Sequence, residues 1–370
     1  MLDLIQVRKE LHKIPELAFE EFQTTEYIKK VLEKFDNLKL HFPDCTGLVA
    51  EYTNGAGDYT LFRADIDALP LTEETGCDFA SENKGKMHAC GHEVHITVLI
   101  GLIEKICERK IEGNFLFVFQ PAEEGKGGAL KILESGILDN FKIRKAFALH
   151  VKGDIHVGTV SSKSGIFFAN TTELDVIFRG VSAHVAFAEK GRDALKAGLE
   201  FYNELEKALQ TEFANPSQIL CKFGKMFAGN VRNAVPDKCI LEGTSRAISN
   251  MDFEKLNKLI KTTADKVAKQ HSVRAEVVFT NFYKAVDNEE ETYNKFKKMI
   301  SESEYKFLEY NTVMGGEDFG FMIEKYGGLL FLLGADNGQK QDLHSTKFLA
   351  DERCIDVGVD VFWKIIENGI

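Results

Sequence analysis

The sequence predicts an α/β fold in which a mostly parallel sheet flanked by helices is interrupted by a smaller, inserted α+β domain. Three observations support this prediction. The chain has 370 residues, more than the roughly 250 to 300 at which a single hydrophobic core usually stops growing. Before residue 150, apolar runs alternate with helical stretches, as they do in parallel α/β sheets. Near residue 170 this pattern changes, which indicates a separate module.

The larger domain opens with two predicted helices, because the apolar residues of 4–32 have near-helical spacing that is broken at Pro15. Strands and helices then alternate along the chain. The predicted strands are residues 59–62, 114–120, 145–149 and the buried run 328–333, and the predicted helices are residues 94–106, 127–138 and 354–367.

The inserted domain begins with residues 173–178, which alternate in hydrophobicity as a half-exposed strand does. Its further predicted elements are strands at 219–223, 239–244 and 274–279 and helices at 193–209 and 253–270. We therefore assign residues 1–169 and 281–370 to the larger domain and residues 170–280 to the insert.

Composition excludes several classes of protein. The net charge of -11 argues against a general nucleic-acid binder, which needs Lys and Arg to neutralise phosphates. No secretory signal is visible at the N-terminus, and no run approaches the roughly 18 apolar residues of a membrane span. The seven cysteines lack paired spacing, which favours reduced thiols. We expect a cytoplasmic protein that binds neither membrane nor nucleic acid.

The first candidate functional segment is residues 87–95, which hold three histidines and a cysteine just before a predicted helix. A single histidine is more often a structural residue than a metal ligand. Four such residues in so short a segment favour ligation, and thiolate and imidazole suit zinc, nickel or cobalt. Cys90 and His92 are therefore candidate ligands.

A second candidate segment follows the apolar run 114–120, where Glu123 and Glu124 would lie at the C-terminal end of a buried strand. Open α/β sheets place their functional sites at that edge. Adjacent side chains point in different directions, so one carboxylate can bind metal while the other acts as a base. His150 ends another apolar strand and reaches the same edge. His344 is a further candidate, and His156 is the alternative to His150 if the strand has another register.

These segments resemble the N-acyl-L-amino-acid amidohydrolase family, which includes aminoacylases, hippurate hydrolases and auxin-conjugate hydrolases. The resemblance covers essentially the whole chain, and its most specific parts are residues 87–92 and 121–125. The remaining matching segments are residues 12–16, 63–70, 233–237 and 316–319 and the region around residue 184.

The resemblance implies a site with two divalent metal ions (zinc, manganese, nickel or cobalt). It implies Glu123 as general base and Asp65 as an acidic residue beside the metals. The implied metal ligands are Cys90, His92, Glu124, His150 and His344.

For the insert, the resemblance implies a lid through which two subunits form a homodimer. It implies that His184 reaches a partner's active site and that Asn233 and Arg246 bind the substrate's carboxylate. Three departures from the family pattern concern a residue near the implied ligands and the lid. Glu93 stands where Asp is usual, the lid reads 181-VSAHVA-186 instead of GGHAA, and residues 233–237 read NAVPD instead of NVIPD.

We expect a hydrolase acting on linear amides that removes an N-acyl group from an amino acid. Residues 71–76 and 168–171 look closest to the bacterial branch that converts N-acetyl-LL-2,6-diaminopimelate to LL-diaminopimelate and acetate in lysine biosynthesis. A distal amino-carboxylate of that kind needs polar partners, for which Asn170, Thr171 and Arg246 are candidates. Three alternatives remain: an N-acyl-amino-acid or hippurate-type specificity, a thiol hydrolase using Cys90, and a metal-binding relative without catalysis.

Overall fold

A computed structural model describes residues 2–370, which form two compact units. The first unit contains the chain as far as Phe167 together with Val286–Asn311 and Asp318–Ile370. The second contains Phe168–Ala285 and the short segment Thr312–Glu317. The sequence did not indicate that residues 312–317 belong with the second unit, because this segment carries no strand or helix pattern of its own.

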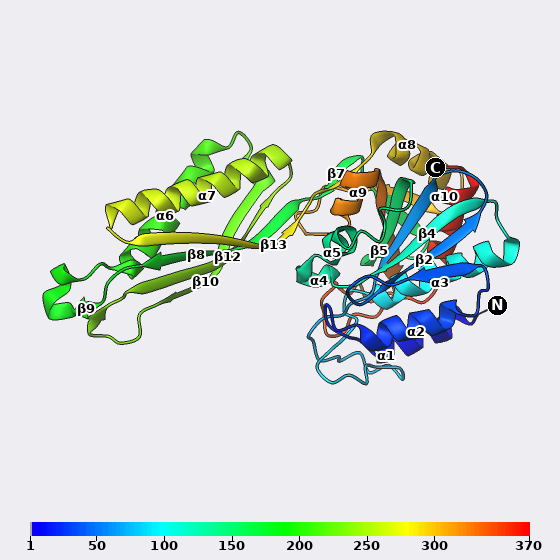
Figure 1. Ribbon diagram of the computed structural model, residues 1–370, viewed down its shortest axis with the longest axis horizontal. Helices are drawn as coiled ribbons and strands as arrows, with labels where there is room; N and C mark the ends of the chain where they lie inside the picture. Colours follow the sequence, from blue (N-terminus) through cyan, green and yellow to red (C-terminus); the bar gives the residue numbers. More distant parts are fainter. Residues whose placement is uncertain (1) are drawn as a thin grey trace. The chain divides into compact units, whose positions relative to one another are not determined.

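The first unit is built on an eight-stranded sheet with the order β1-β2-β4-β3-β5-β16-β6-β15. Figure 1 shows this sheet with its strands β2, β4 and β5 labelled. The four strands at its centre, β4, β3, β5 and β16, run parallel, so the predicted mostly parallel sheet is confirmed. The strands of this unit are β1 (Leu38–His41), β2 (Leu48–Asn54), β3 (Tyr59–Asp65), β4 (Gly113–Gln120), β5 (Ile143–His156), β6 (Thr159–Ser162), β15 (Lys306–Glu309) and β16 (Gly328–Asp336), with the short β7 (Gly165–Phe168) pairing with β14 (Val286–Asn288).

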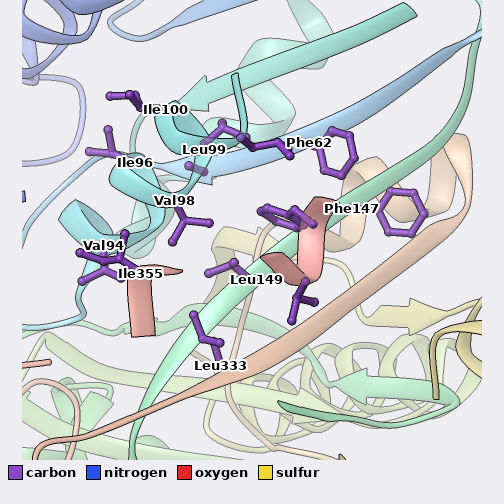
Figure 2. Packing of buried hydrophobic residues seen from close by; sticks show 14 of the residues in the cluster. Phe62, Val94, Ile96, Val98, Leu99, Ile100, Phe147, Leu149, Leu333 and Ile355 are labelled. Atoms are coloured by element: carbon purple, nitrogen blue, oxygen red, sulfur yellow. The ribbon is translucent and has the colours of Figure 1, made fainter. Parts of the chain in front are cut away.

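Helices cover this sheet in two groups, one containing α1, α3 and α10 and the other containing α5 and α9. Helix α3 is buried along most of its length, including its polar residues His92, Glu93 and His95. Figure 2 shows its side chains packed with those of β3, β5, β16 and α10. The helices are α1 (Leu4–Lys13), α2 (Phe22–Leu32), α3 (His92–Arg109), α4 (Glu123–Lys126), α5 (Gly128–Glu134), α8 (Glu290–Ser301), α9 (Gly320–Tyr326) and α10 (Cys354–Glu367).

Two expectations about this unit were wrong in detail. The helix expected over residues 127–138 ends at Glu134, because Gly136 adopts a left-handed backbone with φ 72. Strand β5 continues to His156, because β16 pairs with it as far as Asp336. His150 therefore lies within a strand and not at its end, and it lies beyond Ala148, the last β5 residue that pairs with β3.

The second unit is a four-stranded antiparallel sheet with the order β10-β12-β8-β13, packed against helices α6 and α7. Both helices begin at a side-chain cap, Asp193 for α6 and Ser249 for α7. The elements are β8 (Asn170–Arg179), β9 (Ala183–His184), η1 (Val185–Lys190), α6 (Ala194–Glu212), η2 (Pro216–Gln218), β10 (Ile219–Ala228), β11 (Ala234–Val235), β12 (Lys238–Ala247), α7 (Asn250–Gln270) and β13 (Arg274–Tyr283). Across residues 2–370, no helix combines the length and apolarity needed to cross a bilayer.

Candidate metal centre

The turn before α3 carries Cys90 and His92. Gly91 caps the helix with φ 79, and a Cβ there would lie 2.5 Å from Val151, so the turn requires glycine. Both flanking side chains are buried. The Cys90 Sγ lies 3.4 Å from Nε2 of His150, which joins the end of this turn to strand β5.

Glu123 and Glu124 follow β4 through a second sharp turn. Ala122 has φ 56, and Glu124 departs from helical geometry, so the two carboxylates diverge. A Cβ on Gly128 would lie 1.6 Å from the carbonyl oxygen of Pro121, so the chain folds back tightly on this turn. Both glutamates are thereby fixed at the carboxyl end of β4.

His344 comes from the loop after β16. Its φ is 64, which is rare for a residue with a side chain, and its N–H donates to the carbonyl of Ala89 at 2.8 Å. Its Nε2 lies 3.2 Å from Oε1 of Glu124. The side chain is 54% exposed, so this histidine forms the open side of the cluster.

The donor atoms of these residues form overlapping groups in which every atom lies within 4.8 Å of the others. The structure therefore brings together all five predicted ligands and Glu123. The groups are Cys90 with His92 and His150, Cys90 with Glu124 and His344, and His92 with Glu123 and Glu124.

The side chain of His92 shows that this cluster suits a metal ion. Its Nδ1 donates to the carbonyl oxygen of Asp67 at 2.9 Å, which turns Nε2 toward the other donors. This buried Nε2 makes no hydrogen bond in the described residues. A buried nitrogen without a partner is costly, and a metal ion would satisfy it.

The electrostatics of the cluster also favour a cation. Burial and the carboxylates of Glu124 and Glu123 raise the pKa of Cys90 well above its usual range. Burial opposes protonation of His92, yet Asp65 and Asp67 raise its pKa to about 10. Positive charge is therefore stabilised here, and the thiolate form of Cys90 needs a cation beside it.

Asp65 lies beside the cluster, in contact with three basic groups. Its carboxylate is 3.7 Å from His92 Nε2, accepts from His95 Nδ1 at 2.5 Å and accepts from Arg63 at 2.6 Å. The other ring nitrogen of His95 accepts from the backbone N–H of Val151 at 2.9 Å. His95 therefore links Asp65 to the residue that follows His150.

The sequence reasoning missed two positioning residues, Asp67 and His95. Asp67 receives the N–H of Glu124 at 2.8 Å on Oδ2, and its Oδ1 lies 3.3 Å from Nδ1 of His92, so it contacts two of the expected ligands. Both residues lie in segments that the sequence had singled out, but only their three-dimensional contacts reveal these positions. His156, the alternative to His150, does not join the cluster, because its side chain is 80% exposed and lies 3.3 Å from Asp336.

The remaining predicted site residues, His184, Asn233 and Arg246, lie in the second unit. His184 is exposed in β9, next to Asn233, whose carbonyl accepts from the N–H of Val185 at 3.1 Å. Arg246 lies on β12 opposite Thr171, and its Nη1 donates to the carbonyl of Met314 at 2.5 Å. Its buried Nε has no hydrogen-bond partner among residues 2–370.

Comparison with known proteins shows similarity over nearly the full length of the chain. Residues 61–368 match peptidase family M20/M25/M40. The chain is 34% identical to an N-acetyldiaminopimelate deacetylase of Bacillus subtilis (strain 168), covering 97% of this chain and 96% of the relative. It is 34% identical to the enzyme of that name from Streptococcus uberis, covering 100% of both chains.

Two solved structures show the same fold. A putative aminohydrolase from methicillin-resistant Staphylococcus aureus has a TM-score of 0.92 at 25% identity, covering 98% of this chain and 95% of that one. A dinuclear metal-binding peptidase of the M20 family from Bacillus subtilis has a TM-score of 0.84 at 29% identity, covering 98% and 96%.

Proposed function

Because the chain belongs to peptidase family M20/M25/M40, we propose that it hydrolyses N-acetyl-LL-2,6-diaminopimelate to LL-diaminopimelate and acetate. Membership makes it an amidohydrolase of the deacetylase-like kind. The substrate is proposed from the relatives at 34% identity that carry the name N-acetyldiaminopimelate deacetylase. We place this reaction in lysine biosynthesis. We also propose a cytoplasmic location, with which the seven free cysteines accord.

The observation that carries the proposal is the unpartnered Nε2 of His92 among five other potential donors. We assign two divalent ions to this cluster, each of which would supply Lewis acidity at the scissile amide. Zinc, manganese, nickel and cobalt all accept such a mixed donor set. The proposed ligands are Cys90, His92, Glu124, His150 and His344.

Glu123 is the proposed general base. It takes a proton from the attacking water as the new bond to the acetyl carbon forms, and it returns that proton to the leaving nitrogen as the C–N bond breaks. The products are then acetate and a free amine. Glu123 is buried beside Glu124, on a turn that separates the two carboxylates. This geometry supports a role as base for Glu123 and as metal ligand for Glu124.

His184 is proposed to donate a hydrogen bond to the developing oxyanion from a partner subunit. Its Nδ1 accepts from the N–H of Ala186 at 3.1 Å, which leaves Nε2 to donate. Exposed apolar side chains lie in the same part of the chain, namely Val185 (49% exposed), Phe187 (55%), whose ring contacts that of His184, and Val231 (61%) in the loop before Asn233. Such a patch suits a homodimer formed through the second unit.

Arg246 is proposed to bind a carboxylate of the substrate. Its Nη1 donates to the carbonyl of Met314, and its Nε makes no hydrogen bond among the described residues. The Nε and Nη2 edge of a guanidinium can bind a carboxylate through two parallel bonds. Asn170 and Thr171 lie at the start of β8 in the same unit. They and Asn233 are the further polar groups proposed to recognise the amino-carboxylate ends.

A substrate panel on metal-reconstituted protein tests the proposal. We expect kcat/KM for N-acetyl-LL-diaminopimelate to exceed that for hippurate and N-acetyl-methionine by at least about tenfold, since the loss of one charged partner costs roughly 1.5 to 3 kcal/mol. Equal or better efficiency on hippurate would reassign the specificity within the family. Bound metal without turnover of any substrate would favour a non-catalytic role.

A further inference from the structure

A second group of nitrogen, oxygen and sulfur donors lies in the first unit and shares no residue with the centre described above. His12 comes from α1, while Glu73 and Cys77 come from the segment between β3 and α3. One donor atom from each lies within 4.8 Å of the others. Imidazole, carboxylate and thiolate together suit a borderline divalent ion such as zinc or cobalt.

The spacing of these atoms fits a tetrahedral ion. Bonds of about 2.0 to 2.3 Å separate neighbouring donors around zinc by roughly 3.3 to 3.8 Å. Oε1 of Glu73 lies 3.1 Å from Nε2 of His12 and 3.7 Å from Sγ of Cys77. The third pair of donor atoms, on His12 and Cys77, lies within 4.8 Å, so adjustments of the side chains would place all three donors at bonding distance.

The outer contacts of the cluster already hold its donors in place. Nδ1 of His12 bonds to Glu93 Oε1 at 2.9 Å, and the ring packs edge-on against Phe79 at 5.4 Å. Oε2 of Glu73 accepts from the N–H of Ser81 at 2.7 Å, while Oε1 faces His12 and Cys77 and also accepts from the hydroxyl of Thr75. A carboxylate behind the imidazole and a fixed ligand carboxylate are the supports that protein metal sites require.

The exposure of the three side chains would allow an ion to reach the cluster. The side chains of His12 and Glu73 are 0% and 4% exposed, whereas Cys77 is half-buried. The site is therefore enclosed on the side of the imidazole and open on the side of the thiol. An ion can enter from that side, and water can complete its coordination.

We propose that His12, Glu73 and Cys77 form a third divalent-metal site, for zinc or cobalt, separate from the centre at Cys90 and His92. Binding ties α1 to residues 73–81. The competing possibility is that the three groups only hydrogen-bond to one another, in which case added metal finds no ligand there.

The first test is metal content. Wild-type protein, Cys77→Ser and the control Cys45→Ser are dialysed to equilibrium at one free zinc concentration, and bound zinc per chain is measured by elemental analysis. Cys45 is also a half-buried free thiol but lies between β1 and β2. We expect Cys77→Ser to hold one zinc fewer than both other proteins. Equal zinc in all three overturns the proposal, whatever the occupancy of the first centre.

The second test is protection of the thiol. Alkylation of Cys77 and Cys45 is followed by mass spectrometry of peptides, with and without zinc. We expect zinc to slow alkylation of Cys77 at least tenfold and to leave Cys45 unchanged. Glu73→Gln keeps the side-chain shape and should abolish most of this protection. Undiminished protection in Glu73→Gln, or equal protection of both cysteines, would contradict the site.

Discussion

The groups proposed for chemistry and the groups proposed for substrate recognition are held in different ways. In the first unit, His92 is fixed on Asp67, and Asp65 is buried against His95 and Arg63. In the second unit, His184 is exposed and held by a local contact with the backbone of Ala186. The core thus preorganises the proposed metal donors, whereas the imidazole of His184 is held only by contacts within its own part of the chain.

This contrast makes removal of a metal donor the most damaging change. Cys90→Ala removes a thiolate shared by two of the donor groups, so we expect loss of metal and of all measurable turnover. Cys107→Ala is the matched control, because it removes another buried thiol, near the other end of α3. Elemental analysis with an activity assay checks both. Full metal content in Cys90→Ala would show that the proposed donors are not those used.

His184→Ala tests the exposed side of the contrast. We expect kcat to fall roughly 100-fold to 1000-fold with metal content unchanged, the usual cost of losing an oxyanion donor. His271→Ala is the control, since His271 pairs with Glu200 in the same unit. Mixing inactive His184→Ala and Glu123→Gln subunits should partly restore activity if the histidine crosses between subunits. No recovery would place both residues in sites built from one chain.

Asp67→Asn sharpens the claim that the first unit orients its donors. The amide keeps the shape but weakens the contacts with His92 and the backbone of Glu124, so we expect metal affinity to fall roughly 10-fold to 100-fold. Asp78→Asn, at an exposed position in the following segment, should leave affinity unchanged. Competition with a chelator of known affinity measures the difference. Unchanged affinity would mean that the donors need no such support.

Arg246→Lys has the smallest expected effect. The ammonium keeps the charge but cannot form two parallel bonds, so KM should rise about tenfold while kcat changes little. Arg179→Lys, at an exposed position on β8, serves as the control. Steady-state kinetics on the acetylated substrate separates the two constants. A fall in kcat alone would assign Arg246 to another step.

Much of the first unit is readable from local patterns. Runs of apolar residues identify strands β3, β4 and β16 and helix α3. Donors that follow parallel strands are expected to meet at one edge of the sheet. Local pattern also located the two turns that carry Cys90 and Glu124. It misjudged the length of β5, because the pairing of that strand depends on β16, which lies far along the chain.

The supporting contacts are not readable in this way. Arg8 and His12 both contact Glu93 across more than 80 residues of chain, so the side chain at this position, where the family resemblance has Asp, contacts α1. The orientation of Asp67 and the grouping of Cys77 with His12 depend on side-chain direction, which residue spacing does not encode. The sequence thus indicates which residues are chemically capable, and the packing determines which of them meet.

Glu123→Gln tests the central claim most directly, because metal content and turnover are measured on the same protein. An amide keeps the shape of the side chain but cannot take a proton from water, so metal should stay at the wild-type level while kcat falls by roughly 100-fold to 10,000-fold. Glu124→Gln, its neighbour, should instead lose metal. Near-normal turnover in Glu123→Gln, or loss of metal in that variant alone, would contradict the division of roles between the two glutamates.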